Sequence, residues 1–140
     1  MIITTKVRYA VMAVLEIWHH ELIWQQNKNG KKSITLTQIA ESQQISISYL
    51  EQIFACLKKA NIVSSCRGPG GGYVLAQNPN QITVAGIVKA IGEPIKMTRC
   101  DVAKNSGCLS NKSKCKTHHL WQGLEKQICS YLDSITICNI

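Results

Sequence analysis

Apolar residues repeat with a helical period at the start of the chain. They recur every three or four positions over residues 5–24, at Val7, Ala10, Val11, Val14, Leu15, Trp18 and Leu22. This spacing places them on one face of a helix, which the pattern predicts to be a core helix. The segment at residues 25–33 is polar and basic and carries Gly30, so it is predicted to form an exposed loop.

Two shorter helical patterns follow, at residues 37–43 and 46–60, separated by only a few residues. This is the spacing of a helix-turn-helix. Ser48 followed by Glu51 has the form of a capping box near the start of the second helix. That helix would bury the apolar residues Ile53, Phe54 and Leu57, together with Ile62 beyond its end. Its other face would expose Ser48, Tyr49 and Gln52.

A glycine-rich string separates two β-prone runs at residues 62–66 and 73–76. The string runs from Arg67 and Gly68 to Gly72, and two strands joined by such a loop form a hairpin wing. A nucleotide-binding P-loop does not fit, because no Lys-Ser or Lys-Thr pair follows the glycines. Arg67 is either a solvated surface charge or a contact to phosphate or the minor groove, and the neighbouring helix-turn-helix favours the contact.

The second half of the chain contains two further helical patterns. Residues 82–91 read as a short helix, Gly92 and Pro94 mark a boundary, and residues 96–116 show no periodicity. A long final helix carries one apolar stripe, formed by Leu120, Leu124, Ile128, Leu132 and Ile135. A monomer would expose this stripe, and Trp121 at its start would suit a dimer seam, so we predict a homodimer.

Together these patterns predict a mainly α protein with a small β-hairpin. We expect a winged helix-turn-helix DNA-binding domain at residues 1–92, a cysteine-rich ligand loop at 93–118, and a dimerisation helix with a C-terminal tail at 119–140. A net charge of +8, from 16 Lys and Arg against 8 Asp and Glu, favours a polyanionic partner, either nucleic acid or an acidic membrane surface. The apolar stretch at residues 9–18 is interrupted by Glu16 and is shorter than the roughly 20 residues a spanning helix needs. We therefore expect a cytoplasmic protein without a membrane segment.

Seven cysteines raise the question of chemistry, because disulfides rarely persist in a reducing compartment. Cys100, Cys108 and Cys115 lie close together and are followed by His118, with His119 as a spare candidate. Three thiolates and an imidazole suit zinc or an iron-sulfur cluster, and the pattern does not choose between them. Cys56 and Cys129 are expected to be small buried side chains. We find no paired carboxylates and no nucleophile elbow, so an enzyme is not expected.

Several strings resemble one known family. They are TTKVRYAV at residues 4–11, IAESQQISISYLEQIF at 39–54, VSSCRGPGGGY at 63–73 and CKTHHLW at 115–121. All four are similar to the IscR family of iron-sulfur transcription regulators. The resemblance implies a winged-helix homodimer, crossed by its long C-terminal helix, that binds double-stranded promoter DNA and carries a [2Fe-2S] cluster. It also implies control of cluster-assembly, iron or oxidative-stress genes.

Carried over residue by residue, the resemblance makes Cys100, Cys108, Cys115 and His118 the cluster ligands. Ser46, Ser48, Tyr49 and Glu51 fall on the matching recognition helix, and Arg67 falls on the matching wing position.

Three features depart from the family pattern. The intervals between the cysteines are longer than in the closest relatives, and residues 25–33 look inserted. Arg8 stands where relatives with a larger cluster carry an aspartate, which favours the [2Fe-2S] type. The alternative from the residues alone is a zinc-stabilised nucleic-acid-binding protein whose Cys3His site is structural.

Overall fold

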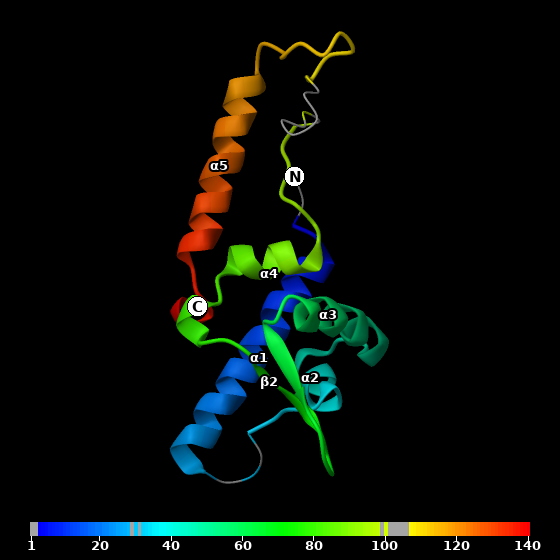
Figure 1. Ribbon diagram of the computed structural model, residues 1–140, viewed down its shortest axis with the longest axis vertical. Coiled ribbons are helices and arrows are strands. Elements are labelled where there is room, and N and C mark those ends of the chain that lie inside the picture. The colour runs from blue at the N-terminus through cyan, green and yellow to red at the C-terminus, as the bar shows by residue number, and fades with distance from the viewer. Residues whose placement is uncertain (1–2, 29, 31, 99, 101–106) are drawn as a thin grey trace.

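The structure is a computed structural model that describes residues 3–28, 30, 32–98, 100 and 107–140. Positions 29 and 31 of the predicted first loop, and 99 and 101–106 of the predicted ligand loop, lie outside the described residues. The elements in chain order are α1 (Thr5–Asn27), α2 (Leu36–Gln43), α3 (Ile47–Lys59), β1 (Val63–Cys66), β2 (Gly72–Leu75), the 3-10 turn η1 (Pro79–Gln81), α4 (Val84–Ile91), α5 (His118–Ser134) and the 3-10 turn η3 (Ile137–Asn139). The mainly α fold with a small hairpin is confirmed. Figure 1 shows a compact body from which α5 extends.

Helix α1 forms the centre of the body. The side chain of Thr4 caps its start by accepting the backbone N–H of Val7, and Ala10, Ala13 and Ile17 on its inner face are fully buried. The helix continues to Asn27, so residues 25–27 are not loop as predicted. Their polar side chains are exposed and are tolerated in a last turn. The helix ends where Lys28 adopts a left-handed conformation with φ 49°.

Helices α2 and α3 form the predicted helix-turn-helix. Helix α3 begins after Ser46, whose Oγ accepts the backbone N–H of Tyr49 at 3.3 Å. The predicted capping box of Ser48 and Glu51 is therefore wrong, because both residues lie inside the helix and are exposed. The start is set by Ile45, which is buried in the core just before the cap. An apolar residue at this position fixes the angle at which the chain enters a helix.

The wing is an antiparallel hairpin in which Val63 of β1 faces Leu75 of β2. Ile34 adds a single antiparallel bridge to Tyr73 on the outer edge of β2. A Cβ atom at Gly72 would lie 2.6 Å from the carbonyl oxygen of Ile34, so this position requires glycine. The rings of Phe54 and Tyr73 pack edge to face with their centroids 4.6 Å apart, which ties α3 to the wing.

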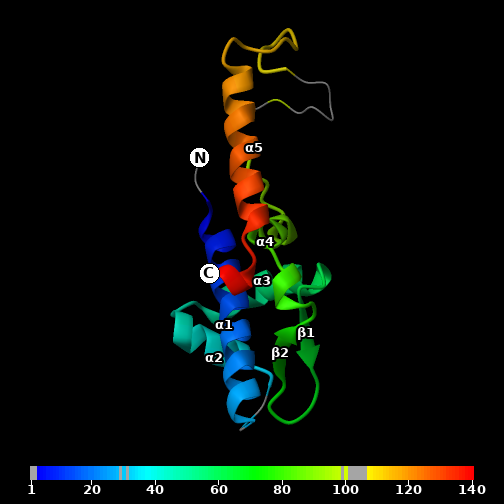
Figure 2. The same ribbon diagram turned by 90° about the vertical axis from the view of Figure 1, so that its left-hand side faces the viewer.

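The end of the chain returns to the body after α5. Ile137 is buried, and its N–H donates to the carbonyl of Ile82 at 3.0 Å. Helix α5 extends away from the body formed by α1–α4 and the wing in both views, and the loop that precedes it lies at its far end (Figure 2). Ile135 lies just beyond its end rather than within it. No helix in the described part of the chain is long and apolar enough to cross a bilayer.

Two cysteines that the sequence predicts to be buried are more exposed than expected. Cys129 is exposed on α5, and Cys56 of α3 is only half-buried. The reason for Cys129 is that much of the surface of α5 has no cover within the described chain. Leu120, Trp121 and Leu124 on the same helix are 62%, 41% and 41% exposed.

Candidate functional site

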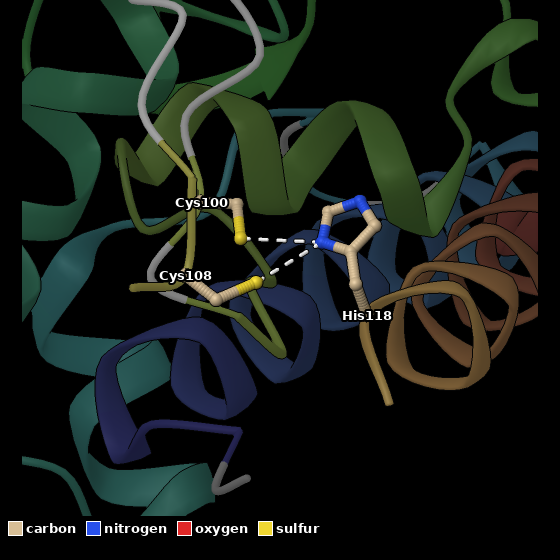
Figure 3. A group of neighbouring side chains, drawn as sticks. All are labelled: Cys100, Cys108 and His118. Atoms are coloured by element: carbon tan, nitrogen blue, oxygen red, sulfur yellow. Dashed lines mark hydrogen bonds between the residues drawn. The ribbon is translucent and has the colours of Figure 1, made fainter. Parts of the chain in front are cut away.

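Two cysteines and a histidine converge where α5 begins. The Sγ atoms of Cys100 and Cys108 each lie 3.2 Å from Nδ1 of His118 (Figure 3). The three ligand atoms lie within 4.8 Å of one another. His118 is the first residue of α5, and both cysteines come from the segment that leads from α4 to this helix. The fold therefore brings together groups that lie up to 18 positions apart in the sequence.

The surroundings of His118 suit a metal ligand. The side chain is buried, and its Nε2 atom has no hydrogen-bond partner among the described residues. Burial lowers the pKa of His118, and the positive charges of Lys114 and His119 lower it further. A neutral imidazole keeps the lone pair that a metal ion binds. Both thiols lie beside the same imidazole nitrogen. This arrangement of two sulfur atoms and one nitrogen resembles the ligands around a single metal ion.

The fourth predicted ligand, Cys115, is not part of this group. Its Sγ atom lies 3.6 Å from Oγ1 of Thr117, and its carbonyl accepts the backbone N–H of His118 at 3.1 Å. Cys115 is half-buried and stands one turn before His118. The spare candidate His119 is exposed, and its ring packs edge to face on that of His118 with the centroids 5.2 Å apart. The structure thus brings together three of the four predicted ligands.

The predicted DNA-contacting residues of α3 divide into two groups. Ser46, Ser48, Glu51 and Gln52 are all exposed. Tyr49 is half-buried instead, because its ring packs edge to face on Tyr9 of α1, with the centroids 5.8 Å apart. The prediction that Tyr49 is exposed like its neighbours is therefore wrong. The exposed hydroxyls and amide can donate to phosphates and to base acceptors, and the carboxylate can accept from a base amino group.

The wing presents Arg67 and Gly68, which are both exposed. Gly68 has φ +123°, a conformation that favours glycine, and its carbonyl accepts the N–H of Gly71 at 3.0 Å. At the base of the wing, Nζ of Lys58 on α3 donates to Oγ of Ser65 on β1 at 2.9 Å. Helix α3 and the wing are therefore joined through side chains on their outer surface as well as through the core.

Glu21 supports the wing, and the sequence analysis missed it. This buried carboxylate of α1 accepts the backbone N–H of Leu75 at 2.8 Å and lies 3.8 Å from Nζ of Lys32. A signal was available in the sequence. Glu21 stands seven positions after Val14 and three after Trp18, so it falls on the predicted apolar face of the first helix. A carboxylate in that position needs a buried partner.

Comparison with known proteins gives consistent results. The sequence model of the Rrf2 family, described as "Iron-dependent Transcriptional regulator", matches residues 3–140. The HTH-type transcriptional regulator IscR of Sodalis glossinidius (strain morsitans) is 40% identical over 140 residues, which cover 100% of this chain and 78% of that protein. The protein of the same name from Yersinia pestis is 39% identical and covers 100% of this chain and 79% of its own length.

Solved structures agree with this. The structure titled "T. potens IscR" is 32% identical, has a TM-score of 0.71, and covers 99% of this chain and 85% of its own. The structure of CymR (YrzC), titled the global cysteine regulator of B. subtilis, is 29% identical and has a TM-score of 0.75. The match covers 99% of this chain and 95% of that chain.

Proposed function

This chain belongs to the Rrf2 family of transcriptional regulators and is a DNA-binding regulator, and from that premise we propose that it senses iron-sulfur status through a bound cluster. The proposed ligands are Cys100, Cys108, Cys115 and His118, and the proposed cofactor is a [2Fe-2S] cluster. The observation that carries the proposal is the convergence of the Cys100 and Cys108 thiols on Nδ1 of the buried His118.

The ligand set fits an iron-sulfur cluster in chemistry. Thiolates and imidazole together hold clusters of this kind, and a bound cluster supplies sensitivity to iron supply and to oxidants. Burial lowers the pKa of His118, which favours the neutral imidazole that binds a metal. Cys115 is proposed as the fourth ligand because it stands one turn before His118.

DNA would be read by α3 and the wing. Ser46, Ser48, Glu51 and Gln52 form the exposed surface of α3 that we propose enters the major groove, with Tyr49 at its edge. Arg67 and Gly68 of the wing are proposed to contact phosphate or the minor groove. Glu51 can accept a hydrogen bond from cytosine, whereas a small displacement would bring its charge toward a phosphate. Its contribution would therefore depend on how α3 is placed.

We propose that the regulator works as a cytoplasmic homodimer. A second copy would cover the exposed apolar side chains of α5, among them Leu120, Trp121 and Leu124. Two recognition helices related by a twofold axis would then face half-sites about one DNA turn apart. The proposed ligand segment connects the DNA-binding body to α5. Ordering that segment can therefore change how the two recognition helices are placed.

Anaerobic purification followed by visible spectroscopy and metal analysis tests the cofactor. A red-brown protein with iron and sulfide supports the proposal, whereas a colourless protein with one zinc per chain supports a structural site instead. Substitution of Cys100, Cys108 and Cys115 by alanine should abolish the colour, leave the protein folded and weaken binding to a cluster-dependent promoter. Cys129→Ala is the matched control, because this exposed cysteine lies outside the site. Equal promoter affinities of the loaded and cluster-free forms would contradict the sensing role.

A further inference from the structure

A hydrogen bond joins α5 to the segment that leads to Cys100. The carboxylate of Glu125 accepts the backbone N–H of Met97 at 2.9 Å in a partly buried position, across 28 positions of sequence. Figures 1 and 2 both show the chain rising beside α5 after it leaves α4. The bond therefore fixes the height on α5 at which this segment is held.

The position of this bond matches the geometry of the metal-binding group. Glu125 follows His118 by seven residues, which corresponds to about 10.5 Å along a helix and returns to the same face within about 20°. Cys100 follows Met97 by three residues, and three residues of chain span at most about 10 Å. The segment runs opposite to α5, since Met97 meets Glu125 and Cys100 meets His118, and this separation lies within the combined reach of the chain and the side chains. Holding Met97 at Glu125 thus allows Cys100 to reach His118.

The start of the same segment is held independently. The hydroxyl of Thr4, the capping residue of α1, donates to the carboxylate of Glu93, and the side chain of Ile95 packs against the core. These contacts anchor the segment to the body, and Ile95 also lines a cavity together with Cys129 and Leu132 of α5. The Glu125 contact relates the segment directly to the helix that carries His118. Its acceptor is charged, which makes such a hydrogen bond stronger than one between neutral groups.

We infer that Glu125 is a positioning residue that sets the register in which Cys100 meets His118. The inference rests on the proposed function, because it assumes that these two residues bind a common metal centre. Loss of the carboxylate would remove the contact that holds Met97 at this position on α5, so the Cys100 thiol would be held less firmly beside the imidazole. Groups that orient metal ligands typically change metal affinity by on the order of 10- to 100-fold.

The test compares Glu125→Ala, Glu125→Gln and a control, Gln127→Ala, at an exposed position of the same helix. Glutamine retains a carbonyl oxygen that can accept the Met97 N–H, whereas alanine removes the acceptor. Two readouts are used. One is the rate at which visible absorbance decays after a chelator is added to the cluster-bound protein, and the other is the affinity of the metal-free protein for Co²⁺. The expected result is on the order of 10-fold faster decay and weaker Co²⁺ binding for Glu125→Ala, with Glu125→Gln and the control close to wild type.

A third readout does not depend on metal. Alkylation of the metal-free protein, followed by mass spectrometry, should show a changed rate at Cys100 in Glu125→Ala while the rate at Cys129 stays constant. If the wild type binds the cluster or Co²⁺ and all three readouts of Glu125→Ala match it, the positioning role alone is overturned. A Glu125→Gln variant as impaired as Glu125→Ala also overturns it, because the hydrogen bond would then not be the cause. A wild type that takes up neither cluster nor Co²⁺ overturns the proposed function and this role with it.

Discussion

Replacing Glu21 by alanine should loosen the wing from the body of the protein. The N–H groups of Tyr73 and Leu75 both point away from β1, on the outer edge of β2. The carbonyl of Ile34 accepts the first at 2.8 Å, and the Glu21 carboxylate accepts the second at 2.8 Å. The bridge at Ile34 is a single residue pair, so the carboxylate takes the place of a longer strand. Without it, the Leu75 amide loses its acceptor.

The magnitude follows from these contacts. A partly buried amide left without its acceptor costs about 1–3 kcal/mol. The ion pair to Lys32 adds no more than about 1 kcal/mol, since the Lys32 side chain is 46% exposed. Glu21→Ala should therefore lower the free energy of unfolding by about 1–4 kcal/mol. Glu21→Gln keeps an acceptor of the same size and should cost about 1 kcal/mol or less.

Urea unfolding followed by circular dichroism measures this difference, at one fixed protein concentration because the proposed dimer would contribute to stability. Glu41→Ala, at an exposed position on α2, is the control for loss of a negative charge. DNA affinity should fall further for Glu21→Ala than for the control, because the wing is less ordered. A Glu21→Ala variant within about 0.5 kcal/mol of wild type, which is the usual range for surface substitutions, would refute this account of the wing. A Glu21→Gln variant as unstable as Glu21→Ala would refute it too.

Three further predictions concern the helix cap, the dimer and the DNA surface. Ser46→Ala should lower the free energy of unfolding in urea by about 1 kcal/mol because it removes the α3 cap, whereas Ser48→Ala should lower it by less than about 0.5 kcal/mol. Equal losses for the two variants would contradict the assignment of Ser46 as the cap. Leu124→Asp should shift sedimentation toward the monomer, and an unchanged dimer would place the seam elsewhere. Arg67→Ala should weaken binding to all DNA sequences and reduce the salt slope by about 1, while Gln52→Ala should lose about 1–3 kcal/mol of preference for the specific site. Binding data in which the two variants behave alike would contradict this division of roles.

The helices and the wing could be predicted because their signals are local. The buried positions Val7, Ala10 and Val14 of α1 follow from the helical period, whereas Ala13 and Ile17, which are also buried, lie outside the predicted stripe. The hairpin follows from two β-prone runs around a glycine-rich turn, which the observed β1 and β2 confirm. In each case the residues that define the element lie close together in the chain.

Contacts between distant residues decided what the sequence could not. The start of α3 depends on Ile45 being buried, so two serines that look equivalent in the sequence differ in role. Tyr49 is half-buried because Tyr9 of α1 lies against it, 40 positions earlier. These outcomes depend on how the helices pack against one another, and spacing within a single helix carries no information about that.

The same division holds for the candidate metal-binding group of Cys100, Cys108 and His118. The sequence by itself determined the chemistry, since cysteines and a histidine in one region form a set of soft ligands that suits a metal centre. The tertiary structure decided that Cys100 and Cys108 meet Nδ1 of His118, while the Cys115 thiol lies beside Thr117. Spacing along an irregular segment does not set distances in space, because such a segment has no fixed rise per residue. Helix α5 holds His118, and the Glu125 contact holds Met97 in the segment that leads to Cys100.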